Sequence, residues 1–228
     1  MSGPDVAVTV TANGPYVVTG GVPLARQTIV TDADGGSVSW REGEPIEVSD
    51  EYRLCRCGQS ATKPFCDESH RRVRFDGTET AGHDPYLADA TVQDGPIASL
   101  TDKESLCAFA RFCDPGGQVW NLIEEPDEQS GALAVREAEL CPSGRLVAWN
   151  RKTHDAFELD YAPSIGLIED PAEKVSGPIW LRGGIPVVDA EGTPYETRNR
   201  VTLCRCGRSS NKPFCDGTHA AIGFRDDA

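Results

Sequence analysis

A pattern of cysteines and a histidine occurs twice in this chain with identical spacing, C-x-C-x8-C-x3-H. The residues are Cys55, Cys57, Cys66 and His70 in the first copy, and Cys204, Cys206, Cys215 and His219 in the second. Three thiolates and one imidazole make a complete four-ligand set for either a zinc ion or a two-iron cluster. We therefore expect two metal sites and look for the function of the protein there.

The spacing indicates how each set is assembled. Residues two apart in an extended segment project to the same side, so Cys55 and Cys57 can bind one metal atom together. Asp67 is suited to cap a helical turn, which would bring Cys66 and His70, four residues apart, onto one face. The second copy repeats these positions. Each site is thus expected to consist of two ligand pairs, and the spacing alone leaves zinc and [2Fe–2S] both open.

Residues between the ligands resemble the signature of the CDGSH iron–sulfur family, to which the mitoNEET-type proteins belong. The matching positions are Ser60, Pro64, Asp67 and Ser69 in the first copy, and Ser209, Pro213, Asp216 and Thr218 in the second. The match covers about sixteen residues in each copy. The resemblance implies one [2Fe–2S] cluster per copy, held by the three cysteines and the histidine. The same eight side chains would therefore bind the cofactors and ligate their metal atoms.

One position departs from that signature. Glu68 stands where the family has glycine, whereas the second copy keeps Gly217. We expect binding to survive and the redox or pH behaviour of the first site to shift. Backbone amides and the Ser60 or Ser209 hydroxyl are expected to hydrogen-bond the sulfurs.

The cysteines allow two other interpretations. A Cys3His set also suits zinc, so the alternative is a zinc-binding or structural-cluster scaffold without a redox role. Structural disulfides fit poorly, because the nine cysteines are an odd number and no export signal is present. The iron–sulfur interpretation carries most weight.

The repeat extends upstream of the ligands. The segment at 14–24 parallels that at 177–187, and each reads as short strands around a Gly-Gly turn. Gly14 lies 41 residues before Cys55 and Gly177 lies 27 before Cys204, so the first copy holds 14 extra residues (41 minus 27), expected in a hairpin near 32–45. Because relatives with one motif pair as intertwined dimers, we expect an intramolecular pseudo-dimer. The fold class is α+β, with units at 1–83 and 166–228 around a central insert at 84–165.

The insert holds the other three cysteines, Cys107, Cys113 and Cys141. Apolar spacing predicts helices over 105–113 and 131–140 and a strand over 146–149. The cysteine spacing, with proline after Cys141, resembles a divergent single-cluster ferredoxin module. That would imply a third iron–sulfur cluster, either [3Fe–4S] or [4Fe–4S] with Asp114 as an outside ligand. The alternative is three small buried residues on amphipathic helices.

Composition limits the partners. The net charge of −14 makes nucleic acid and anionic membrane surfaces poor partners. We find no signal peptide and no apolar run long enough to cross a bilayer, and we expect a cytoplasmic monomer. No nucleophile, base and oxyanion site is assembled, so no catalytic residue is predicted. The expected role is electron transfer, redox sensing or cluster transfer to a redox partner protein or cluster acceptor.

Overall fold

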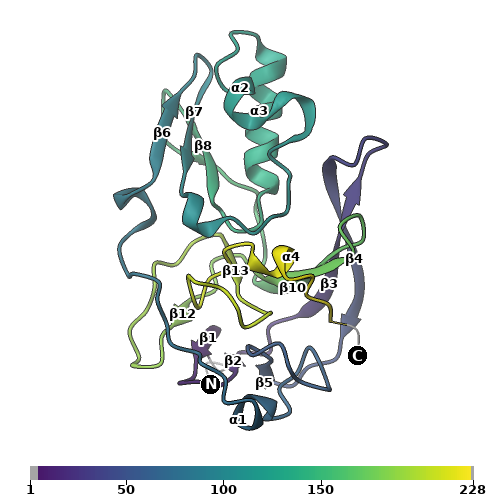
Figure 1. The fold of residues 1–228 in the computed structure, drawn as a ribbon. Coiled ribbons are helices and arrows are strands. Elements are labelled where there is room, and N and C mark those ends of the chain that lie inside the picture. The colour runs from purple at the N-terminus through teal and green to yellow at the C-terminus, as the bar shows by residue number, and fades with distance from the viewer. Residues whose placement is uncertain (1–4, 227–228) are drawn as a thin grey trace.

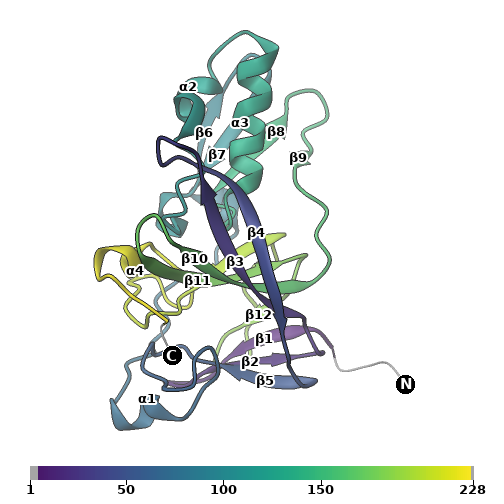
Figure 2. The same ribbon diagram turned by 90° about the vertical axis from the view of Figure 1, so that its right-hand side faces the viewer.

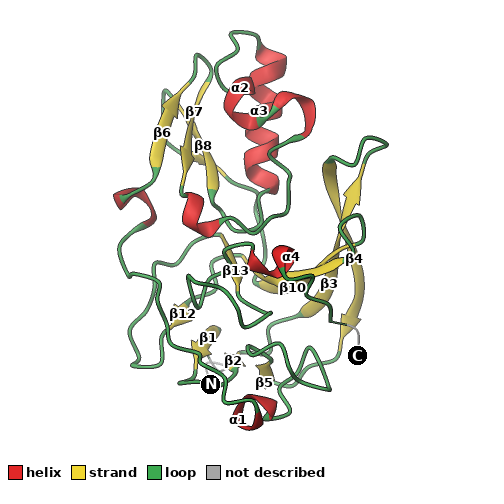
Figure 3. Ribbon diagram, in the orientation of Figure 1, coloured by secondary structure: helices red, strands yellow, loops and turns green. Residues whose placement is uncertain are grey.

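The computed structural model describes residues 5–226, in which short strands dominate and helices are few (Figure 3). Three sheets of four, five and four strands are formed, with one helix of 13 residues and several single turns. The predicted α+β class is confirmed. Within the described residues, no helix is both long enough and apolar enough to span a membrane.

The first copy of the motif is carried by five strands and a helical turn. These are β1 (Ala7–Val10), β2 (Tyr16–Thr19), β3 (Leu24–Thr31), β4 (Ser37–Ile46), β5 (Glu51–Leu54) and α1 (Ser69–Arg72). In β1 and β5, alternate side chains are buried, as expected for strands with one face on the core. The predicted hairpin in the 14-residue excess is formed by β3 and β4.

The second copy repeats this order with four strands and a helical turn, in which the first two strands are longer than those of the first copy and the third has only two residues. These elements are β10 (Ser164–Asp170), β11 (Val175–Arg182), β12 (Val187–Val188), β13 (Arg200–Leu203) and α4 (Thr218–Ala221). The Gly-Gly turns fall where the repeat predicts them, and all four glycines have positive φ. Side chains of β13 are buried throughout, in the strand that leads into the second C-x-C.

The two copies exchange a strand. One sheet has the order β12-β1-β2-β5, so that β12 of the second copy pairs in parallel with β1 of the first, with Val8 opposite Val187. The other has the order β13-β11-β10-β3-β4, so that β3 of the first copy pairs in parallel with β10, with Leu24 opposite Ile165. One apolar core, which includes Tyr16, Leu24, Ile165 and Leu203, joins both sheets.

The β3–β4 hairpin also projects toward the central region (Figures 1 and 2). Trp40 lies in tilted contact with Phe112 and with Trp180, each at 4.7 Å between ring centroids. Its indole nitrogen donates to the carbonyl oxygen of Leu140 at 3.3 Å. The extra residues of the first copy therefore connect the sheets to the end of the long helix.

The central region is a four-stranded antiparallel sheet packed against helices. Its elements are β6 (Thr91–Asp94), β7 (Ala98–Asp102), α2 (Val119–Leu122), α3 (Glu128–Leu140), β8 (Leu146–Asn150) and β9 (Ala156–Phe157). The predicted helix over 131–140 and strand over 146–149 are confirmed within α3 and β8. Asp127 caps α3 by accepting a hydrogen bond from the Ser130 amide at 2.9 Å.

The helix predicted over 105–113 is wrong. A 3-10 turn covers Glu104–Leu106, and an irregular loop with left-handed φ at Phe109 and Arg111 follows it. Ala108, Ala110 and Phe112 are buried from this loop, and Phe112 packs in the aromatic contact with Trp40, whereas Phe109 is 41% exposed. The apolar spacing of this segment therefore reflects tertiary packing of an irregular loop and not helical periodicity.

Candidate metal centres

The donor atoms of each motif lie in two close pairs. Cys55 Sγ is 3.8 Å from Cys57 Sγ, and the equivalent distance between Cys204 and Cys206 is also 3.8 Å. Two thiolates bound at about 2.3 Å to one tetrahedral metal are about 3.8 Å apart. Each C-x-C segment therefore has the bite of a single metal atom.

The third cysteine and the histidine form the other pair. Cys66 Sγ lies 3.5 Å from His70 Nδ1, and Cys215 Sγ lies 3.4 Å from His219 Nδ1. A sulfur at about 2.3 Å and a nitrogen at about 2.0 Å on one tetrahedral metal are about 3.5 Å apart. Within residues 5–226, no group of three or more His, Cys, Asp or Glu side chains is gathered for a single ion. The arrangement is two pairs per site, as the spacing indicated.

Backbone hydrogen bonds bring the two pairs of a site together. The Cys55 amide donates to the Pro64 carbonyl oxygen at 2.8 Å, and the Cys204 amide donates to that of Pro213 at 2.8 Å. A β-bridge between Leu54 and Phe65 continues the strand pairing just before the first ligand. The proline loop thus returns the third cysteine to the strand end.

Asp67 and Asp216 fix the turn that carries the histidine. Asp67 accepts hydrogen bonds from the amides of Ala61 and Ser69, both at 2.9 Å. These hydrogen bonds lower the pKa of Asp67. Burial raises the pKa of Asp216, but hydrogen bonds from Ser210 and Thr218 outweigh it and bring the value to about 2. Both aspartates are therefore ionised at neutral pH. They accept from the first amide of each helical turn, but the N-cap positions are Glu68 and Gly217, so the predicted aspartate caps are not formed.

The sulfur atoms receive hydrogen bonds from the backbone, whereas the serine hydroxyls are used elsewhere. Ser60 Oγ donates to the Phe65 carbonyl oxygen and Ser209 Oγ to that of Phe214, both at 2.7 Å. The Glu68 amide donates to Cys66 Sγ at 3.4 Å. The expectation that the serine hydroxyls bind the sulfurs is thus wrong, because each hydroxyl donates to a backbone carbonyl oxygen within the proline loop.

The local environment favours deprotonated ligands in part of each site. A hydrogen bond from Cys57 lowers the pKa of Cys55 to about 6, aided by backbone amides and opposed by burial. The hydrogen bond from Cys206 does the same for Cys204, also to about 6. Burial lowers the pKa of His219 to about 4, which keeps its imidazole neutral. Thiolates and neutral imidazole are the forms that bind metal.

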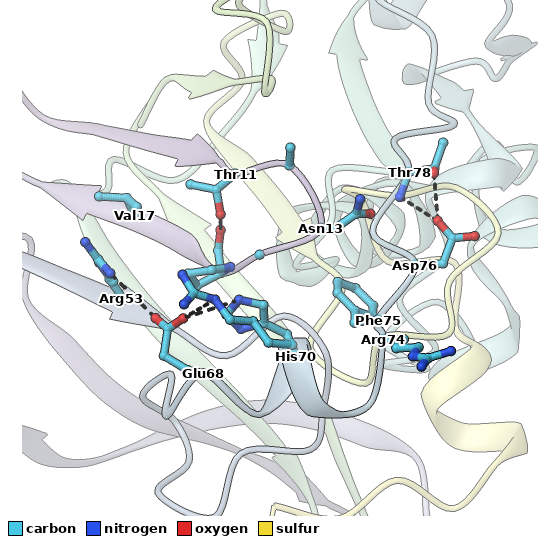
Figure 4. A pocket seen from close by; sticks show the side chains of 14 residues that line it. Thr11, Asn13, Val17, Arg53, Glu68, His70, Arg74, Phe75, Asp76 and Thr78 are labelled. Atoms are coloured by element: carbon cyan, nitrogen blue, oxygen red, sulfur yellow. Dashed lines mark hydrogen bonds and ion pairs between the residues drawn. The ribbon is translucent and has the colours of Figure 1, made fainter.

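Glu68 gives the first site an environment that the second lacks. It has a left-handed backbone with φ of 66°, and the matching Gly217 has φ of 84°. Its carboxylate lies 3.6 Å from His70 Nε2, 2.9 Å from Arg71 Nε and 3.7 Å from Arg53 Nη1 (Figure 4). The side chain therefore reaches the ring of the ligand.

Two arginines inside the C-x-C segments were missed by the sequence analysis, although both copies read Cys-Arg-Cys. Arg56 is 1% exposed and donates to the carbonyl oxygens of Thr11 and Gly77. Arg205 is equally enclosed, bound to Glu169 at 3.2 Å and to Asp226. These hydrogen bonds and ion pairs hold the Cys-Arg-Cys segments in place. The arginine between the two cysteines, present in both copies, is the sequence feature that could have identified them.

The two ligand loops touch each other at their glycines. A Cβ built on Gly58 would lie 2.6 Å from the Cys206 carbonyl oxygen, and one on Gly207 would lie 2.6 Å from that of Cys57. Both glycines have positive φ. This reciprocal contact places the backbone of one site directly against the other.

The remaining three cysteines share the walls of one small cavity in the central region. Cys107 and Cys113 flank the irregular loop, and Cys141 ends α3. All three are half-buried and free. Burial raises the pKa of Cys113, and the charges of Asp114, Cys141 and Cys107 raise it further.

Two known protein families match parts of this chain. The family described as iron-binding zinc finger CDGSH type matches residues 13–71 and 176–220. The family described as divergent 4Fe-4S mono-cluster matches residues 93–151. No curated protein and no solved structure gives a significant match to the chain. The chain therefore contains two regions that match the CDGSH-type iron-binding family, and between them a region that matches the divergent 4Fe-4S mono-cluster family.

Proposed function

We propose that each CDGSH-type site holds a [2Fe–2S] cluster. The pairing of the donors carries this proposal, because a two-iron rhomb takes two ligands per iron whereas a single ion takes all four. In the first site, Cys55 and Cys57 would hold one iron, and Cys66 and His70 the other. In the second site, Cys204 and Cys206 would hold one iron, and Cys215 and His219 the other.

The surrounding residues set the properties of such a centre. When bound, a [2Fe–2S] cluster accepts and releases one electron, and replacing a thiolate by imidazole makes its ligand set less negative. Backbone amides donate to the sulfurs and stabilise their negative charge. The enclosed His219 is kept neutral by burial, whereas Glu68 lies against His70. The two centres are thus held in unequal surroundings.

The central region is proposed to hold a third iron–sulfur cluster on Cys107, Cys113 and Cys141. The family match to this region supports it, as does the shared cavity of the three cysteines. Asp114 is the candidate outside ligand for a four-iron form, with Oδ1 3.7 Å from Cys113 Sγ. Without it, three thiolates suit [3Fe–4S].

The two copies are proposed to form a pseudo-dimer within one chain, divided as 1–83 and 166–228 around the insert at 84–165. The exchanged strands β3 and β12 and the reciprocal glycine contact support this arrangement. A second chain would then not be needed to complete the sheets.

The role that fits best is electron transfer, redox sensing or cluster transfer with a partner protein. A reversible visible spectrum tests it. The purified chain should be red-brown, bleach when dithionite is added and recover in air. A colourless chain that contains stoichiometric zinc would support the scaffold alternative instead.

A further inference from the structure

The first CDGSH-type site borders an open groove. A cavity of about 750 Å³ lies between the turn that joins β1 to β2 and the segment that carries His70 (Figure 4). One wall is the backbone at 11–15, and the other includes Glu68, His70, Arg74 and Phe75. His70 lies in this second wall, so a molecule in the groove would lie beside a ligand of the first centre.

In the second copy, the corresponding groove is crossed by the central region of the same chain. Arg111 binds Asp170, at the turn that joins β10 to β11, with 2.5 Å between Nη1 and Oδ2. On the other wall, a Cβ on Gly217 would lie 3.2 Å from the Cys107 carbonyl oxygen and 3.5 Å from Phe109 Cβ. The segment at 105–111 thus contacts both walls, and about 330 Å³ of cavity remains beside Asp170.

A further contact fixes this internal segment. Asn211, from the loop of the second motif, donates to the Ser105 carbonyl oxygen at 3.0 Å. An extended, irregular piece of chain is therefore the natural occupant of this groove. Among the described residues that line the first groove, none comes from the central region.

The two grooves differ in charge. Arg53, Arg71 and Arg74 line the first. The matching positions of the second copy are Thr202, Ala220 and Gly223. The side chains of Arg53 and Arg71 are 56% and 78% exposed, and Arg74 is exposed as well. Glu68, paired with Arg53 and Arg71, and Asp76, which accepts from Thr78, are the acidic groups that face them.

We propose that the first groove binds an extended acidic segment of a partner protein, placed as residues 105–111 are placed in the second groove. Acidic side chains of that segment would meet Arg71 and Arg74, and an aromatic side chain would take the place that Phe109 has beside Gly217. The functional meaning of this site rests on the proposed clusters, because the groove ends at His70. The binding itself does not depend on them.

The test uses two fluorescent peptides and the full chain. Both peptides carry residues 105–112 with Cys107→Ser, and one also has Arg111→Glu to match the basic groove. Fluorescence anisotropy should show saturable binding of the Glu peptide that weakens with salt, and at least about tenfold weaker binding of the Arg peptide.

Variants locate the binding. The double change Arg71→Glu and Arg74→Glu should weaken binding of the Glu peptide about tenfold or more, while Arg136→Glu on the exposed face of α3 should leave it unchanged. Visible absorbance and circular dichroism of each variant report whether it still folds and keeps its centres. Absent binding, equal binding of the two peptides, or indifference to the double change in a folded variant would overturn the proposal.

Two further outcomes separate the alternatives. If the solution mass of the parent chain doubles as its concentration is raised, and that of the double variant does not, the occupant of the first groove is a second copy of the chain. The assignment to a partner protein would then be wrong. If a colourless, zinc-loaded chain binds the Glu peptide with the same preference, the docking site stands and the cluster assignment fails.

Discussion

His70 and His219 occupy the same place in two identical ligand sets, yet their neighbours differ. Each presents Nδ1 to the paired cysteine at 3.4 to 3.5 Å. Both rings are buried, with 8% exposure for His70 and 4% for His219, but only Nε2 of His70 lies beside Glu68 and the open groove. Differences between the two centres should therefore originate in residues around the ligands.

Replacing either histidine by cysteine tests its part directly. His70→Cys and His219→Cys should each keep the cluster, lower its reduction potential and remove its loss in acid, because a thiolate replaces a protonatable imidazole. Potentiometric titration and visible absorbance during acidification measure both effects. His154→Cys, outside both motifs, is the control. A cluster lost with the parent pH profile would show that the histidine is not a ligand.

Glu137 is a buried carboxylate without a hydrogen-bond partner in the described part of the chain. It is 3% exposed. Burial raises its pKa from 4.5 to about 8, and the charge of Asp114 adds to this. Between about pH 4.5 and pH 8, Glu137 is protonated in the folded chain and ionised in the unfolded chain. The free energy of unfolding therefore falls as the pH rises through this range.

Glu137→Gln should remove that dependence. At pH 8 the variant should be more stable than the parent by about 1–3 kcal/mol, since no buried charge forms. Denaturant unfolding at pH 5 and pH 8 measures the difference, with the exposed Glu128→Gln as control. A variant that retains the parent slope would mean that Glu137 is not the titrating group.

At the scale of elements, the ligand segments were the most predictable part of the molecule. C-x-C at a strand end and Cys-Asp before a helical turn depend on local geometry, and both copies form as the sequence indicated. The helix predicted over 105–113 is a 3-10 turn and a loop instead, because its buried Phe112 packs against Trp40, which lies 72 residues earlier in the chain. The periodicity of a short segment contains no information about a contact with a residue far away in the chain. The exchange of β3 and β12 is equally non-local, and no local pattern in the sequence indicates it.

The glycine contact between the two ligand loops gives a prediction at this scale. Gly58→Ala should destabilise the chain by about 2–5 kcal/mol, since the methyl group meets the Cys206 carbonyl oxygen and φ is positive. Gly35→Ala has a similar φ and nothing within 4 Å of the added Cβ, so it isolates the backbone cost. It should cost only about 1–2 kcal/mol. Equal losses in thermal unfolding of the two variants would show that the loops do not touch.

For the whole molecule, the exchanged strands predict a self-contained chain. Both sheets are completed by strands of the same chain, so we expect a monomer of 24.5 kDa in solution. The net charge of −14 also opposes self-association at low salt. Light scattering over a range of dilutions measures the mass. A dimer that persists on dilution would mean that the copies pair between chains.

The central claim is that each CDGSH-type site holds two irons rather than one ion. The most direct measurement is the iron and acid-labile sulfide content of a chain in which Cys107, Cys113 and Cys141 are replaced by alanine, joined to electron paramagnetic resonance of the reduced protein. The account predicts two irons and two sulfides at each of the two sites, and a reduced spectrum typical of [2Fe–2S] centres with mixed nitrogen and sulfur ligands. One metal ion per site without sulfide would contradict it.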